Sequence, residues 1–341
     1  MPDMRMTKTV IAAAVFSSLC ASPQTLDIHF VDVEGGQATL IVTPAKESLL
    51  VDAGWPGFEG RDAARIAAAA KKAGVSRIDY LLVTHYHRDH VGGVEQLSER
   101  LPVGVLVTHG PNTESGQGAS EMNALFNRAA AKSKSLVVKP GDRIPLKGAD
   151  VVVVAARGER IARPLPGAGA SNASCAAARQ KEADNSENAR SVGFLLTFGK
   201  FRFVDLGDLT WNKEIELACP RSLLGTVDVY LTTHHGMNIS GPAELVHALR
   251  PRVAIMNNGA KKGGSPEAWQ VVRQSPGLED IWQVHFALAG CKDHNSPEDK
   301  IANMDESCQG YGISLSARKD GGFAVHNARN GVTKEYKPRK G

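Results

Sequence analysis

The chain has 341 residues, of which 42% are hydrophobic, so it is long and apolar enough to bury a substantial core. Its formal net charge is only +4, and the basic residues are spread along the chain rather than clustered. Composition therefore indicates a globular protein. It leaves nucleic acid open as a partner but provides no electrostatic footprint that would indicate one.

The first residues predict an export signal. Arg5 and Lys8 precede an apolar stretch from Val10 to Phe16, and a segment of mostly small residues follows as far as Ser22. This is the layout of a secretory signal peptide, and the apolar stretch is far shorter than the roughly 20 residues of a membrane-spanning helix. We expect residues 1–22 to be removed and the rest of the chain to be periplasmic or secreted, without a membrane span.

Four cysteines remain after that segment, an even number in a compartment that would favour disulfides. Cys291 and Cys308 flank one polar, turn-rich segment, so we expect this pair to be bonded. Cys175 and Cys219 are then left for a second bridge, although connectivity does not follow from sequence alone. No two cysteines stand at CxxC spacing, so a zinc site built from them is not expected.

The first half of the chain opens with short apolar segments separated by turn residues and then alternates between strands and helices. The opening strands, expected over residues 26–33, 38–43 and 48–51, predict an antiparallel meander. Further strands are predicted over residues 80–84, 103–108, 136–138 and 151–154, and helices over residues 61–73, 91–100 and 119–131. This alternation is typical of α/β layering.

A stretch rich in Ala, Gly, Ser, Pro and Asn, near residues 157–190, is interpreted as a long loop inserted between two similar halves. In the second half we predict strands over residues 192–197, 201–205, 227–232 and 252–256, and helices over residues 211–218, 242–249 and 266–273. The two halves suggest one domain over residues 23–341, with sheets packed face to face and helices outside.

The strongest chemical signal is the run His85-Tyr86-His87-Arg88-Asp89-His90, which directly follows a predicted buried strand. Alternate residues of an extended segment point the same way, so His85 and His87 can hold one metal ion while Asp89 and His90 turn toward a second. Imidazole and carboxylate ligands suit zinc or another divalent transition metal. The run therefore predicts a metal centre with one or two ions.

This run resembles the HxHxDH signature of the metallo-β-lactamase superfamily, which implies a four-layer αβ/βα sandwich. Further motifs follow in the order that the resemblance implies. Asp52 corresponds to an early Asp that supports the metal loop from behind, and Asp208, in Gly207-Asp208, to the carboxylate that bridges both metals. The last ligand comes from the pair His234-His235; we favour His234, because it is the first residue after the strand and its two threonines.

A narrower resemblance, over residues 26–286, is to the β-lactamase-like domain of ComEC-type competence proteins. It rests on an Asp-Val-x-Gly-Gly core, the turn before Asp208, the His-His-Gly and the segment Asn257-Asn258-Gly259. This chain departs from the superfamily in lacking a third histidine at a clearly matching place before Asp208. His109 is one candidate for that ligand, and the alternative is a first site that binds its metal weakly.

The resemblance implies an exported hydrolase that uses a metal-bound hydroxide on phosphodiester bonds, in a small molecule or a polymer. Asp89 and His235 are the residues that we expect to act in catalysis, His235 as a proton donor to the leaving group. A β-lactamase or lactonase is one alternative, and a non-catalytic secreted binding protein that retains the fold is another.

Overall fold

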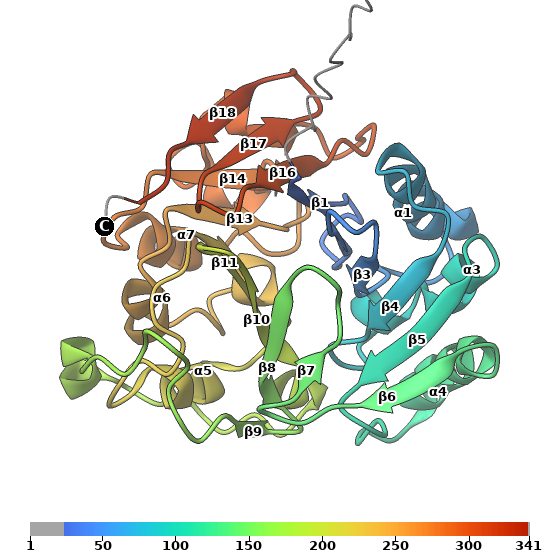
Figure 1. Ribbon diagram of the computed structural model, residues 1–341, viewed down its shortest axis with the longest axis horizontal. Helices are drawn as coiled ribbons and strands as arrows, with labels where there is room; N and C mark the ends of the chain where they lie inside the picture. The colour runs from blue at the N-terminus through green and yellow to red at the C-terminus, as the bar shows by residue number, and fades with distance from the viewer. Residues whose placement is uncertain (1–23, 340–341) are drawn as a thin grey trace, which may run out of the picture.

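The structure is a computed structural model that describes residues 24–339, so the predicted signal segment, residues 1–22, lies outside the described residues. Within that range the chain forms two nine-stranded sheets packed face to face, with helices on both outer surfaces (Figure 1). The four-layer αβ/βα sandwich predicted from the sequence is therefore confirmed.

The first sheet has the strand order β18-β17-β16-β1-β2-β3-β4-β5-β6. Its strands are β1 (Leu26–Phe30), β2 (Thr39–Val42), β3 (Ser48–Val51), β4 (Ile78–Leu82), β5 (Val103–Thr108), β6 (Lys134–Val137), β16 (Ile313–Ala317), β17 (Phe323–Asn327) and β18 (Thr333–Tyr336). The meander β1-β2-β3 is antiparallel, as predicted, whereas β3 to β6 run parallel.

The second sheet has the order β15-β14-β13-β12-β11-β10-β8-β7, with β9 paired to β8. Its strands are β7 (Arg143–Ile144), β8 (Asp150–Ala156), β9 (Glu159–Arg160), β10 (Gly193–Phe198), β11 (Phe201–Asp205), β12 (Val229–Leu231), β13 (Val253–Met256), β14 (Asp280–His285) and β15 (Ile301–Asn303). Strands β11 to β15 run parallel, so their carboxyl ends share one edge.

Seven α-helices cover the sheets within the described residues. They are α1 (Arg61–Lys72), α2 (Arg88–Val91), α3 (Val94–Ser98), α4 (Gln117–Ala130), α5 (Trp211–Ala218), α6 (Ala243–Leu249) and α7 (Pro266–Arg273). Figure 1 shows α1, α3 and α4 outside the first sheet and α5 to α7 on the opposite outer side. The largest apolar cluster lies between the sheets, since it joins residues such as Phe30 of one to Phe203 of the other.

The helix predicted over residues 91–100 is broken in the structure into α2 and α3. The break falls at Gly92 and Gly93, which lie against the chain at Ala53 and Pro56. A Cβ atom at Gly93 would stand 2.0 Å from the Ala53 carbonyl oxygen, and one at Gly92 would stand 2.1 Å from a Pro56 side-chain carbon. The two glycines therefore let the loop after β3 pack directly on the metal-binding loop.

The favoured prediction, a disulfide between Cys291 and Cys308, was wrong. Cys175 and Cys219 form a disulfide, with Cα atoms 5.7 Å apart, whereas Cys291 and Cys308 are both free thiols. The predicted loop over residues 157–190 runs back along the end of α5, where the backbone nitrogen of Asn172 donates to Pro220. This packing places Cys175 beside Cys219.

None of the described helices is long and apolar enough to span a bilayer.

One buried carboxyl group makes stability depend on pH. Glu214 of α5 is fully buried and accepts a hydrogen bond from the Gly241 nitrogen at 2.6 Å, and burial raises its pKa from 4.5 to about 8. A carboxyl group with a raised pKa in the folded state stabilises the fold fully only below its ordinary pKa, and this contribution disappears as the pH rises through about 8.

Glu214→Gln, which stays neutral, is therefore expected to match the parent protein near pH 4 and to melt roughly 3 °C or more above it at pH 9. Thermal unfolding followed by circular dichroism across this range measures the difference. Glu216→Gln is the control on the same helix, because that carboxylate is partly exposed beside Lys213. A constant difference between Glu214→Gln and the parent at every pH would contradict the assignment.

Candidate metal centre

The predicted site residues lie in loops at the carboxyl ends of parallel strands from both sheets. Strand β4 leads into the His85–His90 run, and β11 and β12 lead to Asp208 and to the pair His234-His235. Because the two sheets face each other, these ends converge, although the His85–His90 run is more than a hundred positions before Asp208 in the sequence. The topology thus brings the separate motifs to one place.

Asp208 is the residue around which the site is arranged. One of its carboxylate oxygens, Oδ2, lies 3.3 Å from His90 Nε2 and 3.2 Å from His234 Nε2, and the other, Oδ1, lies 3.5 Å from His235 Nε2. Burial alone would raise the pKa of Asp208, but the neighbouring imidazoles outweigh it and hold this pKa well below the usual range.

Asp89 lies on the other side of the same group. Its Oδ2 is 3.2 Å from both His90 Nε2 and His235 Nε2. Asp89, His90, Asp208 and His235 each offer one ligand atom, and these four atoms lie within 4.8 Å of one another. His234 stands outside this group of four and contacts it through Asp208 and through the edge-to-face packing of its ring on that of His235.

The chemistry of these atoms fits a divalent metal ion. His85 Nε2, His90 Nε2, Asp208 Oδ1 and both ring nitrogens of His235 are buried without a hydrogen-bond partner. Unpaired buried polar atoms cost free energy unless something satisfies them, and a cation bound by their lone pairs would do so. The donor set of imidazole and carboxylate suits zinc or another divalent transition metal.

Asp52 and Thr84 fix the orientation of two of the histidines from behind. The Asp52 carboxylate accepts hydrogen bonds from the Thr84 nitrogen at 2.8 Å, from the Thr84 hydroxyl at 2.7 Å and from His90 Nδ1 at 2.7 Å. The Thr84 hydroxyl also accepts from His85 Nδ1 at 3.0 Å. With the proton held on Nδ1, each ring turns the lone pair of Nε2 toward the cluster. The prediction that Asp52 supports the metal loop is thereby confirmed.

The pair His234-His235 adopts an unusual backbone. Both residues have a positive φ, 55° in each case, which is a backbone conformation that residues other than glycine rarely adopt. The His234 nitrogen donates to the Gly207 carbonyl at 3.0 Å, which ties this turn to the loop of Asp208. The turn directs both imidazoles toward Asp208, and backbone strain of this kind is concentrated at functional sites.

His87 and His109 differ in their surroundings. His87 is the partly exposed member of the run, with Nε2 at 3.2 Å from Glu114 Oε1. His109 instead pairs with the buried carboxylate of Glu187, at 2.8 Å. Burial would raise the pKa of Glu187, but the hydrogen bonds from His109 and Thr113 lower it to about 2. His109 thus has a partner of its own, and Glu114 is a carboxylate in contact with His87.

Lys262, which the sequence reasoning missed, reaches the centre from the loop after β13. Its ammonium group contacts Asp89 Oδ2 and lies 5.1 Å from the centre of the Trp55 ring. No motif marks this lysine in the sequence. Only the approach of the loop after β13 to the loop after β1, at Gly35 and Gly259, brings it into place, because the neighbouring Gly36 packs against Asp89.

A second group of potential ligands, Asp32, His285 and Cys308, lies apart from this centre. Here Asp32 accepts from His285 Nε2 at 2.7 Å and pairs with the Arg65 guanidinium at 3.0 Å. A cation of the protein itself therefore already compensates these groups.

Comparison with known proteins finds a family likeness over part of the chain. Residues 31–175 match the profile of the family described as the metallo-beta-lactamase superfamily, a segment that contains Asp52 and the whole His85–His90 run. The part of the chain that holds the first metal-binding motif is therefore similar to that superfamily.

Among curated proteins, a hydroxyacylglutathione hydrolase from Klebsiella pneumoniae subsp. pneumoniae is 32% identical over 81 residues, which is 24% of this chain and 26% of that protein. One from Alkalilimnicola ehrlichii is 43% identical over 60 residues, 18% of this chain and 22% of that protein. The matched segments thus span about a quarter of the length of these relatives.

Among solved structures, the metallo-beta-lactamase fold protein YhfI from Bacillus subtilis matches with a TM-score of 0.48 and 9% identity, over 76% of this chain and 96% of that chain. CmlA, a diiron beta-hydroxylase from Streptomyces venezuelae, matches with a TM-score of 0.41 and 17% identity, over 75% of this chain and 48% of that chain.

Proposed function

We propose that this protein is an exported, metal-dependent hydrolase that cleaves phosphodiester bonds. The observation that carries the proposal is the set of buried, unpartnered ligand atoms on His85, His90, Asp208 and His235. A divalent ion bound there would lower the pKa of a water molecule and stabilise negative charge in the transition state. Zinc or another divalent transition metal suits this ligand set.

The geometry suggests how the ligands divide between two ions. His85 and His87, with Asp208, would hold the first ion, and Asp89, His90, Asp208 and His235 would hold the second. His235 is fully buried within this second group, so we assign it as a ligand rather than as a proton donor. His234, 7% exposed, has its Nδ1 3.4 Å from the Ser240 hydroxyl and turns Nε2 to Asp208.

The charges around the centre favour an anionic substrate. Lys262 places an ammonium group against Asp89, and the exposed Arg88, which pairs with Glu121 at 3.0 Å, lies one residue before Asp89 in α2. A phosphodiester brings a negative charge that these two cations would attract and orient. The resemblance of the sequence to ComEC-type domains supports the same class of substrate.

A second candidate is thioester hydrolysis, because two of the matched relatives carry the name hydroxyacylglutathione hydrolase. The matched segment in the second of them covers only 18% of this chain and 22% of that relative, so most of neither protein is compared. A panel of substrates separates the two candidates.

The experiment is to purify the mature protein, determine bound metal by elemental analysis, and assay bis(4-nitrophenyl) phosphate, S-lactoylglutathione and a chromogenic β-lactam side by side. We expect one or two divalent ions per chain and turnover of the phosphodiester that chelation abolishes and zinc restores. Faster cleavage of the thioester or of the β-lactam would replace the proposed substrate class. Full metal occupancy without turnover of any of the three would favour a binding protein.

The proposed export is supported by the disulfide bond. The disulfide between Cys175 and Cys219 is a feature of oxidising compartments. Expression of the full chain in a Gram-negative host is expected to yield a periplasmic protein whose mature N-terminus is Pro23. Recovery of the uncleaved chain from the cytoplasm would contradict it.

A further inference from the structure

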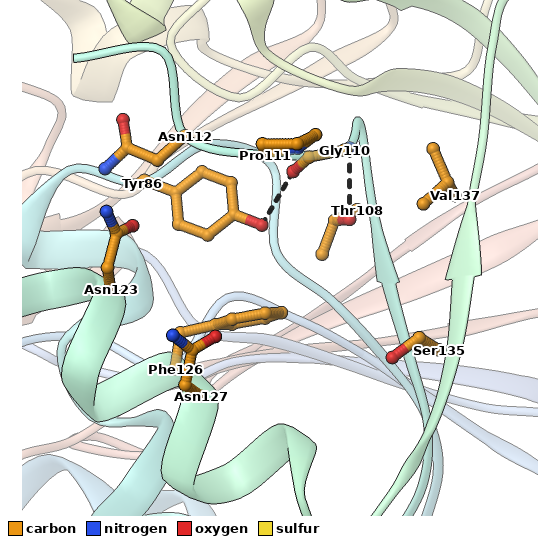
Figure 2. Close-up of a pocket in the computed structure, with 10 residues that line it drawn as sticks. All are labelled: Tyr86, Thr108, Gly110, Pro111, Asn112, Asn123, Phe126, Asn127, Ser135 and Val137. Atoms are coloured by element: carbon orange, nitrogen blue, oxygen red, sulfur yellow. Dashed lines mark hydrogen bonds between the residues drawn. The ribbon is translucent and has the colours of Figure 1, made fainter.

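A hollow in the surface lies beside the metal-binding loop. It encloses about 420 Å³ between α4, the carboxyl ends of β5 and β6, and the loop after β5 (Figure 2). We call it the asparagine pocket, after Asn112, Asn123 and Asn127, which line it. A volume of this size is within the usual range for small-molecule sites.

The sequence explains why the amides meet there. Asn123 and Asn127 are four residues apart on α4 and therefore share one face of that helix, with Phe126 beside them. Ser135 and Val137 alternate along β6 and so present their side chains on the same side of the strand. Figure 2 shows Asn123 rising from the helix toward the loop that carries Asn112.

The lining is polar but carries no charge, since none of the ten lining residues is ionised at neutral pH. One hydrogen-bond donor in it is unused: Asn112 Nδ2 is buried without a partner, while its Oδ1 accepts from the Glu114 nitrogen at 2.9 Å. The orientation of this amide is thus fixed with its NH₂ group free. The pocket suits an uncharged group that is rich in hydrogen-bond acceptors and donors.

One aromatic ring supplies flat surface. Tyr86 and Phe126 meet edge to face, with ring centres 5.2 Å apart and an angle of 75° between their planes. Tyr86 is itself buried, and its hydroxyl donates to the Gly110 carbonyl at 2.8 Å, as the dashed line in Figure 2 shows. Tyr86 therefore holds the loop that carries Asn112, and the partly exposed Phe126 is the ring that remains open to the pocket.

The pocket adjoins the metal loop, because Tyr86 belongs to that loop and also lines the pocket. Tyr86 stands between His85 and His87 in the chain, and it lines both the asparagine pocket and a neighbouring hollow of about 340 Å³. That neighbouring hollow is also lined by His87, Arg88 and Glu114. A substrate extending from the metal centre past His87 and Arg88 would reach the asparagines.

We infer that the asparagine pocket binds the nucleoside part of a nucleotide phosphodiester, an inference that rests on the proposed phosphodiesterase function. An asparagine amide offers a donor and an acceptor side by side, which matches the paired groups on the edge of a base such as adenine. Aromatic side chains supply surface on which a base can stack. The phosphate would then lie between Arg88 and Lys262, at the metal centre.

Binding of adenosine to the metal-loaded protein tests the pocket without any chemistry. Titration calorimetry is expected to show saturable binding that Asn123→Ala and Asn127→Ala each weaken about fivefold, the effect of losing one hydrogen bond to a neutral group. Gln117→Ala is the matched control, because it removes an exposed amide from the same helix outside the pocket. Absence of adenosine binding, equal binding of methyl glucoside, or an equal effect of Gln117→Ala would overturn the inference.

Kinetics separate this inference from the proposed function. Asn123→Ala is expected to raise KM about fivefold for the 4-nitrophenyl ester of thymidine 5′-monophosphate and to leave bis(4-nitrophenyl) phosphate, which has no base, unchanged. Turnover of both esters with equal sensitivity to Asn123→Ala would overturn the pocket assignment and leave the phosphodiesterase intact. Adenosine binding that Asn123→Ala weakens, without hydrolysis of either ester, would refute the phosphodiesterase and leave the pocket as a nucleoside site.

Discussion

Asp208→Asn is expected to remove bound metal from the centre and to reduce turnover about a thousandfold or more. The carboxylate of Asp208 is the group that lies within 3.5 Å of three imidazoles at once, His90, His234 and His235. An amide of the same shape carries no charge and presents an NH₂ group to one of these rings. Removing one partner from a buried charged group costs about 3–5 kcal/mol, which corresponds to the expected loss.

The measurement is metal content per chain together with kcat/KM. Asp205→Asn is the control, because Asp205 is equally buried and only three residues earlier, yet it accepts hydrogen bonds from Gln37 and Gly207 rather than from histidines. It should retain its metal. If Asp205→Asn lost metal and Asp208→Asn kept it, Asp205 would be the metal ligand of this loop, and the assignment of Asp208 would be wrong.

Asp52→Asn is expected to weaken metal binding by about 10–100-fold while the folded protein persists. All the hydrogen bonds that Asp52 makes with Thr84 and His90 arrive from donors, so it accepts through both of its oxygens. An asparagine can accept through one oxygen only, and its NH₂ group would face a donor. Asn also tolerates the positive φ of 60° at this position, so the substitution tests the hydrogen bonds rather than the backbone.

Competition with a chromogenic chelator measures this affinity. At saturating zinc the variant should recover most of its turnover, because Asp52 orients His90 without touching the substrate. Asp62→Asn serves as the comparison, since this buried carboxylate accepts from Trp55 and Arg61, outside the metal centre. An unchanged zinc affinity in Asp52→Asn would show that the histidines are held by packing alone.

The metal-binding loop was predictable because its residues are contiguous. Four ligand-type side chains within six positions after a buried strand define both a location and a chemistry, and Asp208 followed from the resemblance of Gly207-Asp208 to a later motif of the superfamily. Lys262 and Glu114 were not predictable in this way. Each is an ordinary polar residue in a loop, and only the packing of one loop on another places it beside Asp89 or His87.

Most of the strands and helices were predicted to within a few residues, because alternating and helical patterns of apolar residues are local signals. The last five strands, β14 to β18, were not, and the disulfide between Cys175 and Cys219 was predicted only as a second bridge. Cys175 and Cys219 are 44 residues apart and meet through the packing of a long loop that has little periodicity. Strands β16 to β18 are short, and their place in the first sheet depends on pairing with β1, at the far end of the chain.

That pairing has a consequence for how the molecule is made. Leu26 lies opposite Ala317, so the opening strand has a neighbour on only one side until residues 313–317 have been synthesised. A nascent chain that ends before residue 313 would display an open backbone edge, which invites association with other chains. Assembly of the first sheet must therefore wait until β16 has been made, and this delay would suit the proposed export, in which the chain crosses a membrane before it acquires its native form.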